Sequence, residues 1–411
     1  MKKVVNFFKN GNLIVQIVIG MVLGILLALI SKEAAVSVGI LGSIFVGALK
    51  AIAPILIFIL VIVAIATKPV NVKTDIKPIL VMYFAGMFLA AFASVAASFM
   101  FPTHLALVDI DPYMSAAAAP VKVQDVIKNV ILNMIDNPVH ALSSANFIGV
   151  LTWGVGIGIA LHHGSTKATK EILKDVNHSA LKLVRFVISL APFGIFGIMA
   201  ETFAATGFSS LLSYGRLLLV LVGTMLFVAF IINPLIMYIK SRRNPYPLLF
   251  VCLKESAITA FFTRSSAANT PINLELCKKM GLNQDTYSVS IPLGSVINMS
   301  GAAVTVTVFA LSTAYTLNIE VSIASALVLC IISALAACGT SGVAGGSLLL
   351  IPLACSLFDI SGDVAMQVVA IGFLIGVVQD SVETALNSST DVMFTAAASQ
   401  NPPNLKLEEI D

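Results

Sequence analysis

The sequence has few charged residues for its length. Only 11% of its 411 residues are Asp, Glu, Lys or Arg, whereas 58% are hydrophobic. A soluble globular domain carries about 25% charged residues, because its surface must remain hydrated. We therefore expect this chain to expose much of its surface to lipid, and its apolar runs reach the roughly 20 residues that a membrane-spanning helix needs.

Other shortages exclude several classes of function. The five cysteines form no Cys-x-x-Cys pair, which argues against a disulfide framework or a zinc site. The formal net charge of +3 is too small to indicate binding to nucleic acid. No Gly-x-x-x-x-Gly-Lys-Ser/Thr motif is present, so ATP is not expected to act directly. The five histidines lie in predicted loops or at the ends of apolar segments, which disfavours a histidine-dependent enzyme.

Six apolar segments of membrane-spanning length occupy the N-terminal part of the chain. They cover residues 13–31, 38–66, 79–101, 145–162, 181–205 and 213–239. Most lysines and arginines of the connecting loops lie on one side of these segments. The opposite side holds four basic residues, Lys32, Lys122, Lys128 and Arg216. Because positively charged loops stay in the cytoplasm, we expect both termini there and the polar segment 102–146 outside.

The pattern changes after residue 246. Two apolar stretches, 248–277 and 322–358, are interrupted in the middle by small and polar residues, so neither half can cross about 30 Å of hydrocarbon alone. Each is predicted to form a re-entrant helical hairpin, hairpin 1 and hairpin 2. An unwound helix at 287–313 follows hairpin 1, and a polar last helix at 364–398, interrupted between residues 380 and 391, follows hairpin 2.

The unit of an interrupted hairpin and an interrupted helix thus occurs twice. Non-helical backbone at membrane depth is tolerated only inside protein or around a water-filled cavity. Paired interruptions in two halves of a chain point to a binding site near the midplane of an inverted-repeat transporter. The competing interpretation, kinked helices packed by glycine and serine, does not explain the charged residues beside the breaks.

The last helix carries the strongest candidates for a binding site. Asp380, Glu383, Thr384, Asn387 and Asp391 recur at spacings of three and four, so they share one helix face. Ionisable groups inside a membrane span are costly and functional by default. The alternative is a solvated helix end, but apolar turns flank this polar face on both sides.

An oxygen-rich cation site is predicted where the unwound helix meets the last helix. The side-chain oxygen of Asn298, backbone carbonyls freed near Gly294 and Gly301, and the carboxylate of Asp391 are hard donors. Such oxygen ligands suit Na⁺, as the ends of broken helices do in transporters.

The hairpin tips are predicted to hold an organic substrate. Ser265 and Ser266 begin a half-helix whose free N–H groups can bind an anion such as an α-carboxylate. The ammonium group of an amino acid would then face Asp380. The glycine-rich tip of hairpin 2 turns easily and could form a lid over this substrate.

In order, these motifs resemble the dicarboxylate/amino acid:cation symporter family, the relatives of the glutamate transporters. The matching features are the serine-rich first tip, the Asn-Met-Ser-Gly break, the glycine-rich second tip and the last-helix residues Asp380, Thr384, Asn387 and Asp391. The likeness covers nearly the whole chain. It implies an all-α polytopic membrane protein with eight transmembrane helices, two re-entrant hairpins and inverted repeats, and a secondary transporter rather than an enzyme.

The resemblance also implies a domain organisation and an assembly. Residues 1–246 would form a six-helix region for scaffolding and trimerisation, with spans three and six joining the transport domain. Residues 247–400 would form the transport core, and 401–411 a cytoplasmic tail. The protein would be a homotrimer in the bacterial inner membrane.

Roles for individual residues follow from the same resemblance. Asp380 would bind the substrate amino group, and Ser266 and Asn387 its carboxylate. The remaining substrate-site residues would be Arg264, Ser265, Val343, Gly345, Glu383 and Thr384. One Na⁺ would lie at Gly294, Asn298, Asn387 and Asp391. A second Na⁺ would lie at Val296, Ala337, Cys338 and Thr340.

Departures from the family pattern concern specificity. Members that carry acidic substrates have an Arg where this chain has Glu383, and a Thr where it has Ala302. A carboxylate at that position disfavours an acidic substrate. It can accept a hydrogen bond from a hydroxyl, unless it pairs with Arg264 instead. We therefore expect Na⁺-coupled import of serine and threonine, as in the bacterial sodium/serine–threonine symporters, which the whole chain resembles most.

A third Na⁺ site is not expected. Ser300 replaces the Asp of members with that site, and Gly86 and Met87 stand opposite their Thr-Ser pair, although Tyr83 remains. A buried cation without a carboxylate would be poorly compensated.

Three alternative functions remain open from the sequence. The first is a dicarboxylate or acidic amino acid symporter coupled to Na⁺ or H⁺. The second is a channel with a permanent pore, and the third is an intramembrane hydrolase. The hydrolase is disfavoured because no histidine or lysine base is placed beside Ser265 or Ser266.

Overall fold

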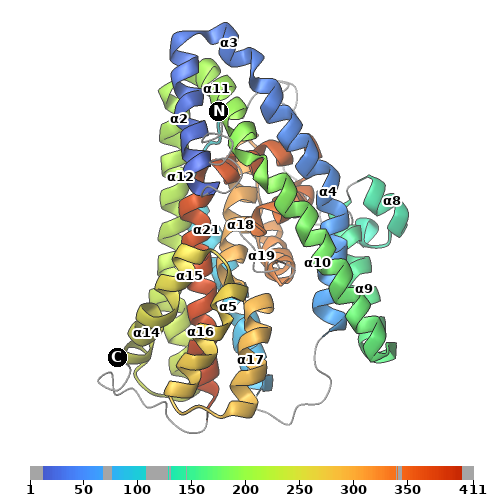
Figure 1. Cartoon of the computed structure of the whole chain (residues 1–411), viewed down its shortest axis with the longest axis vertical. Helices are drawn as coiled ribbons and strands as arrows, with labels where there is room; N and C mark the ends of the chain where they lie inside the picture. The colour runs from blue at the N-terminus through green and yellow to red at the C-terminus, as the bar shows by residue number, and fades with distance from the viewer. Residues whose placement is uncertain are drawn as a thin grey trace, which may run out of the picture.

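The computed structural model describes residues 13–67, 76–107, 128, 131–144, 146–338, 340 and 345–399. Within these ranges every regular element is a helix (Figure 1). The N-terminal part contains α2 (Leu13–Ile30), α3 (Lys32–Ser37), α4 (Gly39–Ala66), α5 (Ile76–Met100), α8 (Pro138–Ser143), α9 (Phe147–Gly164), α10 (Lys167–Ser189), α11 (Ala191–Thr206), α12 (Phe208–Phe227), the π-helix η1 (Val228–Ile232) and α13 (Asn233–Ser241).

The C-terminal part follows the predicted order of hairpin, helix, hairpin, helix. Its elements are α14 (Tyr246–Cys252), the π-helix η2 (Leu253–Ala257), α15 (Ile258–Thr263), α16 (Ser266–Lys279), α17 (Gln284–Ile297), α18 (Ser300–Thr316), α19 (Ile323–Ala337), the 3-10 helix η3 (Ser347–Leu350), α20 (Ile351–Cys355), the 3-10 helix η4 (Ser356–Phe358) and α21 (Gly362–Ala398).

Five helical runs in the described residues are long and apolar enough to cross a membrane. They are Ile76–Met100, Leu212–Ser241, Tyr246–Thr263, Gln284–Thr316 and Gly362–Ala398. The first arm of hairpin 1, Tyr246–Thr263, is thus longer than predicted, because its 18 residues alone reach membrane-spanning length. Shorter apolar helices accompany them, among them Ile148–Gly164 and Ala191–Ala205. The predicted all-α polytopic architecture is therefore confirmed.

One predicted span has different bounds. The segment predicted as 181–205 is divided at Leu190, which ends α10 and precedes α11. Pro192 is the second residue of α11, and a proline is favourable in the first turn of a helix but not in its interior. Helix α10 begins earlier than predicted, at Lys167, where Thr166 caps it by accepting a hydrogen bond from the Thr169 N–H.

Both hairpins turn back on themselves. In hairpin 1 the first arm, α14 to α15, contacts the second arm, α16, and the two arms lie side by side in Figure 1. In hairpin 2 the first arm, α19, contacts η3 and α20 of the second arm. Hairpin 1 packs on α21 through α15 and α16, whereas hairpin 2 packs on α18 through α19 and on both α18 and α21 through α20.

The two long helices differ in continuity. The helix after hairpin 1 is broken as predicted, because Asn298 and Met299 have non-helical backbone angles between α17 and α18. The predicted interruption of the last helix is wrong, since α21 runs unbroken from Gly362 to Ala398. Residues 377–398 contain neither glycine nor proline. The hydroxyl groups of Thr384, Ser389 and Thr390 donate to carbonyls four residues earlier, so the polar side chains do not disrupt the helix.

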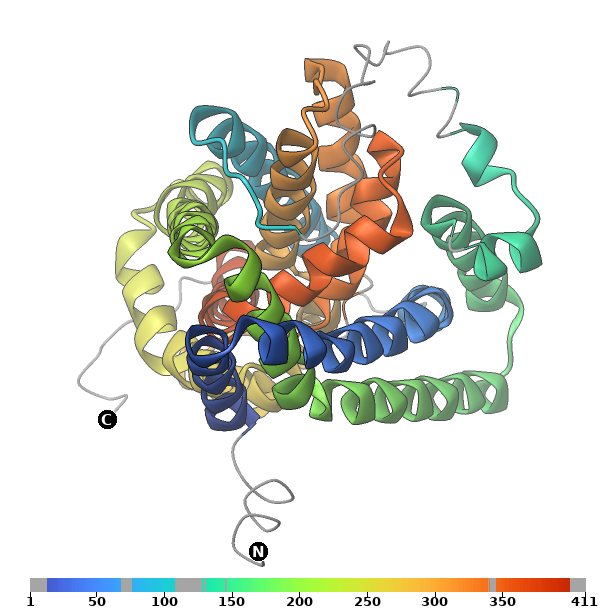
Figure 2. The same cartoon turned by 90° about the horizontal axis from the view of Figure 1, so that it is seen from above.

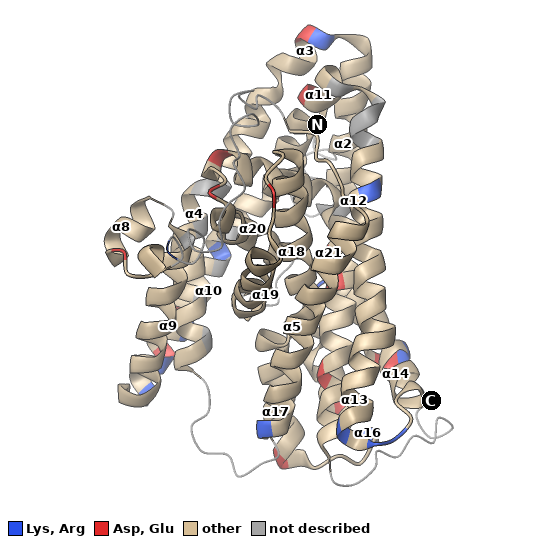
Figure 3. Ribbon diagram, turned by 180° about the vertical axis from the view of Figure 1, so that it is seen from behind, with Lys and Arg blue, Asp and Glu red and all other residues tan. Residues whose placement is uncertain are grey.

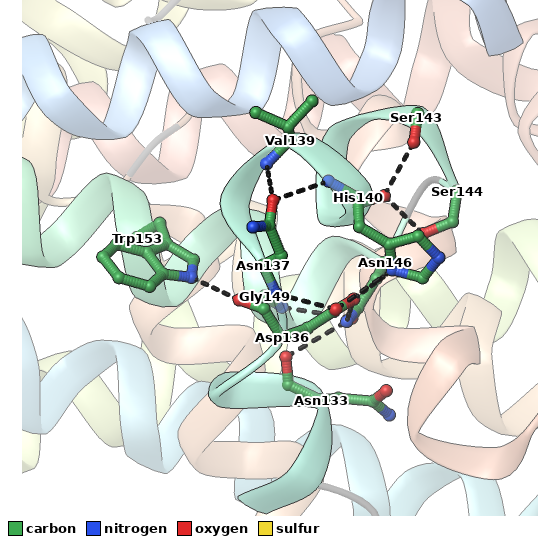
Figure 4. A network of polar contacts seen from close by, with 10 residues as sticks. All are labelled: Asn133, Asp136, Asn137, Val139, His140, Ser143, Ser144, Asn146, Gly149 and Trp153. Carbon is green, nitrogen blue, oxygen red and sulfur yellow. Dashed lines mark hydrogen bonds and ion pairs between the residues drawn. The ribbon is translucent and has the colours of Figure 1, made fainter.

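An exposed polar network closes the turn before α9 (Figure 4). The carboxylate of Asp136 accepts hydrogen bonds from Asn146 Nδ2 at 2.9 Å and from His140 Nδ1 at 2.9 and 3.0 Å. The backbone carbonyl of Asp136 accepts from the indole N–H of Trp153 at 2.7 Å. The hydrogen bonds from Asn146 and His140 lower the pKa of Asp136.

Candidate functional site

The polar face of α21 is enclosed by protein. Asp380, Glu383, Thr384, Asn387 and Asp391 are each at most 6% exposed. Helices α15, α16, α17 and α18 all contact α21, so both hairpin 1 and the broken helix cover this face. The spacing argument that placed these five residues on one face therefore describes a buried surface in the middle of the protein.

The tip of hairpin 1 consists of two residues, one that ends α15 and one that caps the start of α16. Arg264 adopts a left-handed conformation (φ 49°) that ends α15. Ser265 is extended and caps α16, and its hydroxyl accepts a hydrogen bond from the Ala268 N–H at 3.3 Å. Ser266 is the first helical residue and is buried. The first N–H groups of a helix lack intrahelical acceptors, and the predicted anion site at this tip lies at such a helix start.

Arg264 pairs with Asp380 and not with Glu383. The Nη1 atom of Arg264 lies 3.7 Å from Asp380 Oδ2, and both side chains are largely buried. The other oxygen, Oδ1, accepts a hydrogen bond from the Gly345 N–H at 3.1 Å. No hydrogen bond from the described residues reaches Asp380 Oδ2, which is buried. Asp380 thus joins the tips of the two hairpins and keeps one oxygen without a hydrogen-bond donor.

Gly345 is suited to this position by its backbone. Its φ of +74° is rare for residues with a side chain, and an added Cβ would lie 2.9 Å from the ring of Phe373. Glycine therefore allows the turn that brings its N–H to Asp380.

Glu383 is held by three donors. Its Oε2 atom accepts hydrogen bonds from Thr305 Oγ1 at 2.7 Å, from Ser347 Oγ at 2.9 Å and from Gln379 Nε2. These donors come from α18, from the second arm of hairpin 2 and from α21 itself. They fix the orientation of the carboxylate, and the possible ion pair between Glu383 and Arg264 that the sequence left open is not formed.

Residues of the predicted first cation site lie close together in the structure. Asn298 Nδ2 donates to Asp391 Oδ1 at 2.8 Å, while Asn298 Oδ1 and Asp391 Oδ2 are buried without a hydrogen-bond donor from the described residues. An added Cβ on Gly294 would lie 2.5 Å from Asp391 Oδ1 and 2.6 Å from Tyr83 Oη. Gly294 is helical and permits this close approach, so the helix does not unwind there.

Asn387 connects the same site to α18. Its Oδ1 atom accepts a hydrogen bond from the Gly301 N–H at 2.7 Å, and its backbone carbonyl accepts from Asn298 Nδ2 at 3.4 Å. Gly301 is helical and packs directly on Glu383, because an added Cβ would lie 2.9 Å from Glu383 Cγ. The broken helix therefore contacts the polar face of α21 on both sides of its break.

The four residues of the predicted second cation site all lie in the described part of the chain. Thr340 donates twice to the Ala337 carbonyl, from its N–H at 3.0 Å and from Oγ1 at 2.7 Å. The thiol of Cys338 lies 3.4 Å from the Ala334 carbonyl and 3.8 Å from Met87 Sδ. Val296 is half-buried in α17. Val343, predicted to contact the substrate, lies outside the described residues.

A buried network that the sequence analysis missed fastens hairpin 1 to α21. Asn269 Nδ2 donates to Ser388 Oγ at 2.8 Å and to Ser256 Oγ at 3.0 Å. Asn273 Nδ2 donates to the carbonyl and hydroxyl oxygens of Ser388 at 3.0 Å each, and Ser256 Oγ donates to Asn273 Oδ1 at 2.6 Å. Two asparagines four residues apart on α16 were the signal that could have revealed it.

Three further hydrogen bonds lie at the C-terminal part of α21, two of them to its side chains. Asn233 Nδ2 on α13 donates to Thr390 Oγ1 at 2.9 Å. Ser290 and Thr395 share a hydrogen bond of 2.8 Å, and Tyr83 on α5 donates to the Ser290 carbonyl at 3.2 Å. Figure 3 shows acidic residues in the interior along this bundle, away from the charged ends of the helices.

Comparison with known families assigns the chain. A sequence model of the Sodium:dicarboxylate symporter family matches residues 13–401, nearly the whole chain. The chain therefore belongs to the sodium:dicarboxylate symporter family, and the predicted family membership is confirmed. It is a multi-pass membrane protein that couples the transport of a small organic substrate to Na⁺.

Proposed function

We propose that this symporter imports small neutral amino acids, serine and threonine, with Na⁺ by alternating access. The observation that carries the proposal is the position of Glu383, a buried carboxylate one helical turn from Asp380 on the same face of α21. Two carboxylates in one pocket would repel the side chain of an acidic substrate. A zwitterion with a neutral side chain adds no such repulsion.

The orientation of Glu383 suits a hydroxyl donor. The three hydrogen bonds that it accepts from described residues all end on Oε2. These bonds fix the carboxylate, and Oε1 is left as the oxygen that would accept from the hydroxyl of serine or threonine. A site built to accept such a hydrogen bond discriminates strongly against analogues that lack the donor.

The amino and carboxylate groups have complementary partners nearby. Asp380 Oδ2 has no hydrogen-bond donor from the described residues, so the substrate ammonium can satisfy it. The start of α16 at Ser266 would bind the α-carboxylate, with Asn387 and Thr384 beside it. Binding of the substrate ammonium to Asp380 would then weaken the contacts of Asp380 with Arg264 and Gly345.

One Na⁺ is proposed at Asn298 Oδ1 and Asp391 Oδ2, which are buried without a donor from the described residues, together with Asn387 and the Gly294 carbonyl. These are hard oxygen donors with a single carboxylate, which suits a monovalent cation. A second Na⁺ is proposed at Val296, Ala337, Cys338 and Thr340.

No third Na⁺ is proposed. An added Cβ on Gly86 would face the ring of Phe394 at 3.3 Å, and Met87 is fully buried. These two residues offer no side-chain oxygen where a third site would need one.

Residues 1–246 are proposed to serve mostly as scaffold and residues 247–400 as transport core, with both termini in the cytoplasm. The protein is proposed to assemble as a homotrimer in the bacterial inner membrane. Helix α10 supports this, because one side of it exposes large apolar residues at helical spacing. They are Ile172, Val176, Leu183 and Phe186. Cross-linking through cysteines placed on this row should yield a trimer band. A monomer band alone would contradict the proposed homotrimer.

Substrate competition tests the proposal. Purified protein in proteoliposomes with an inward Na⁺ gradient should accumulate labelled L-serine. Excess unlabelled L-serine or L-threonine should abolish the signal, whereas L-aspartate, L-glutamate and succinate should not. Accumulation above the external concentration would also separate a symporter from a channel.

A dicarboxylate or acidic amino acid is the second candidate. It is favoured by Arg264, whose guanidinium lies beside the site and can bind a carboxylate in a bidentate manner. Displacement of labelled serine by aspartate or succinate at equal concentration, or uptake that persists on a proton gradient without Na⁺, would favour this candidate.

A further inference from the structure

Arg216 is a charged residue on the outer surface of a membrane-spanning helix. It lies in α12, which continues through η1 and α13 as one helical run from Phe208 to Ser241. The neighbouring residues Leu212 and Leu219 are 76% and 75% exposed, so this face of the helix is turned to lipid. Within the described part of the chain, no carboxylate forms an ion pair with Arg216.

The depth of Arg216 places it at the edge of the hydrocarbon. With a rise of 1.5 Å per residue, the run from Phe208 to Ser241 is roughly 50 Å long. It exceeds the hydrocarbon core of roughly 30 Å by roughly 10 Å at each end. Arg216 lies roughly 12 Å from the beginning of the run. Its long side chain can therefore reach the level of the lipid phosphates.

Two apolar grooves meet at Arg216. The first has a volume of about 610 Å³ and runs between α5 and α12, which lie side by side in Figure 2. Small residues open it, among them Ala93 and Ala97 on α5 and Gly223 on α12. The second groove, of about 600 Å³, lies on α12 beside Gly215 and reaches Val378 on α21.

We propose that Arg216 and these two grooves form a binding site for one anionic glycerophospholipid. The guanidinium would bind the phosphate, with which its planar fork forms paired hydrogen bonds. One acyl chain would lie in the groove between α5 and α12, and the other on α12 towards α21. The charge and the shape both fit a phospholipid. Arg216, which has no ion-pair partner among the described residues, stands at the headgroup level where two apolar grooves begin.

The grooves can be filled without disturbing the protein. A Cβ added at Gly223 or at Gly215 would meet no other atom within 4 Å. Gly223→Leu would therefore occupy the first groove and Gly215→Leu the second. Gly156 on α9 is equally open and lines neither groove, so Gly156→Leu is the matched control.

Native mass spectrometry of the detergent-purified full chain tests the site. Protein would be mixed with phosphatidylglycerol or phosphatidylcholine of the same chain length, and bound lipid counted. The wild type should retain one phosphatidylglycerol in at least roughly tenfold preference, a difference of about 1.4 kcal/mol. Arg216→Gln should remove this preference, and Arg216→Lys should keep part of it. Gly223→Leu and Gly215→Leu should reduce the binding of both lipids, and Gly156→Leu should not.

The competing explanations give different results. Phosphatidylglycerol preference that survives Arg216→Gln, or lipid binding unchanged by both groove-filling variants, would overturn the proposal. Displacement of the lipid by millimolar inorganic phosphate would also overturn it, because the grooves would then contribute nothing. The thermal unfolding midpoint of each variant in lipid-free detergent confirms folding. The result is independent of which substrate the symporter carries.

Discussion

The two hairpins have the same outline but are fastened to α21 in different ways. Hairpin 1 is held by the buried network of Ser256, Asn269, Asn273 and Ser388, none of which is predicted to touch the substrate. This network is complete without any ligand, apart from Asn269 Oδ1, which lacks a donor from the described residues. Hairpin 1 is therefore expected to remain attached to α21 whether or not the site is occupied.

Hairpin 2 reaches α21 through the carboxylates of the predicted substrate site. The Gly345 N–H donates to Asp380, and the Ser347 hydroxyl donates to Glu383. A substrate that binds these carboxylates would compete for the groups that hold the tip. We infer that hairpin 2 is the element whose position depends on the ligand, in agreement with the lid predicted from its glycine content.

The largest expected effect comes from Asp380, which touches both tips. Asp380→Asn keeps an oxygen that can accept from the Gly345 N–H but removes the charge that faces the substrate ammonium. We expect Na⁺-driven serine uptake to fall roughly 100-fold or more, because a buried charge loses its partner. The measurement is initial uptake in proteoliposomes. The exposed carboxylate variant Asp136→Asn is the control, and near-normal uptake by Asp380→Asn would refute the assigned role.

Glu383 tests the specificity of the site. Glu383→Arg replaces a negative charge by a positive one, so a substrate with a second carboxylate should gain at least roughly tenfold in affinity relative to serine. Competition by L-aspartate against labelled L-serine measures this shift. Unchanged serine uptake and continued exclusion of aspartate would show that Glu383 does not contact the substrate.

Asn269 tests the tether of hairpin 1. Asn269→Ala removes the buried hydrogen bonds that Asn269 Nδ2 donates to Ser388, Ser256 and Asn273, which costs about 1–3 kcal/mol of stability. The fall in the thermal unfolding midpoint should be the same with and without serine and Na⁺, because no residue of the network is proposed to contact the substrate or Na⁺. A fall in the unfolding midpoint that appears only when serine is bound would contradict the inference that hairpin 1 is held to α21 independently of the ligand.

Ser347 tests the tether of hairpin 2. Ser347→Ala removes one of three hydrogen bonds to Glu383 Oε2, so the loss of stability should be smaller, about 1 kcal/mol. Hydrogen exchange of residues 345–350 should increase in the ligand-free protein and should be restored in part by serine. Equal hydrogen exchange of these residues in the ligand-free and the serine-bound protein would show that the position of the hairpin 2 tip does not depend on the ligand.

The smallest effect is expected at Asp136, outside the membrane-spanning helices. Its pKa is lowered in the folded protein by hydrogen bonds from Asn146 and His140. The stabilisation is therefore present above the ordinary pKa of an aspartate and is lost as the pH falls through the lowered value. The midpoint difference between the wild type and Asp136→Asn should shrink below about pH 4. Trp153 is the only tryptophan of the chain and donates a hydrogen bond to the Asp136 carbonyl. Its fluorescence therefore reports whether this turn is disrupted as the pH falls.

Local rules predicted the elements and the polar face. Helical spacing put Asp380, Glu383, Thr384, Asn387 and Asp391 on one side of a helix, and all five are buried there. Polar interruptions predicted both hairpins and the break at Asn298. The same reasoning fails for α21, where the polar side chains leave the helix unbroken, because the hydroxyl groups among them donate to carbonyls four residues earlier.

What the amino-acid sequence determined by itself was the order of hairpins and long helices in the C-terminal part, the polar face of α21 and the family to which the chain belongs. Only the tertiary structure decided which groups meet that face. Glu383 bonds to Thr305, 78 residues away, and Asn269 to Ser388, 119 residues away, while Arg264 pairs with Asp380. Spacing within one helix is fixed by backbone geometry, whereas these partners depend on how separate helices pack against one another.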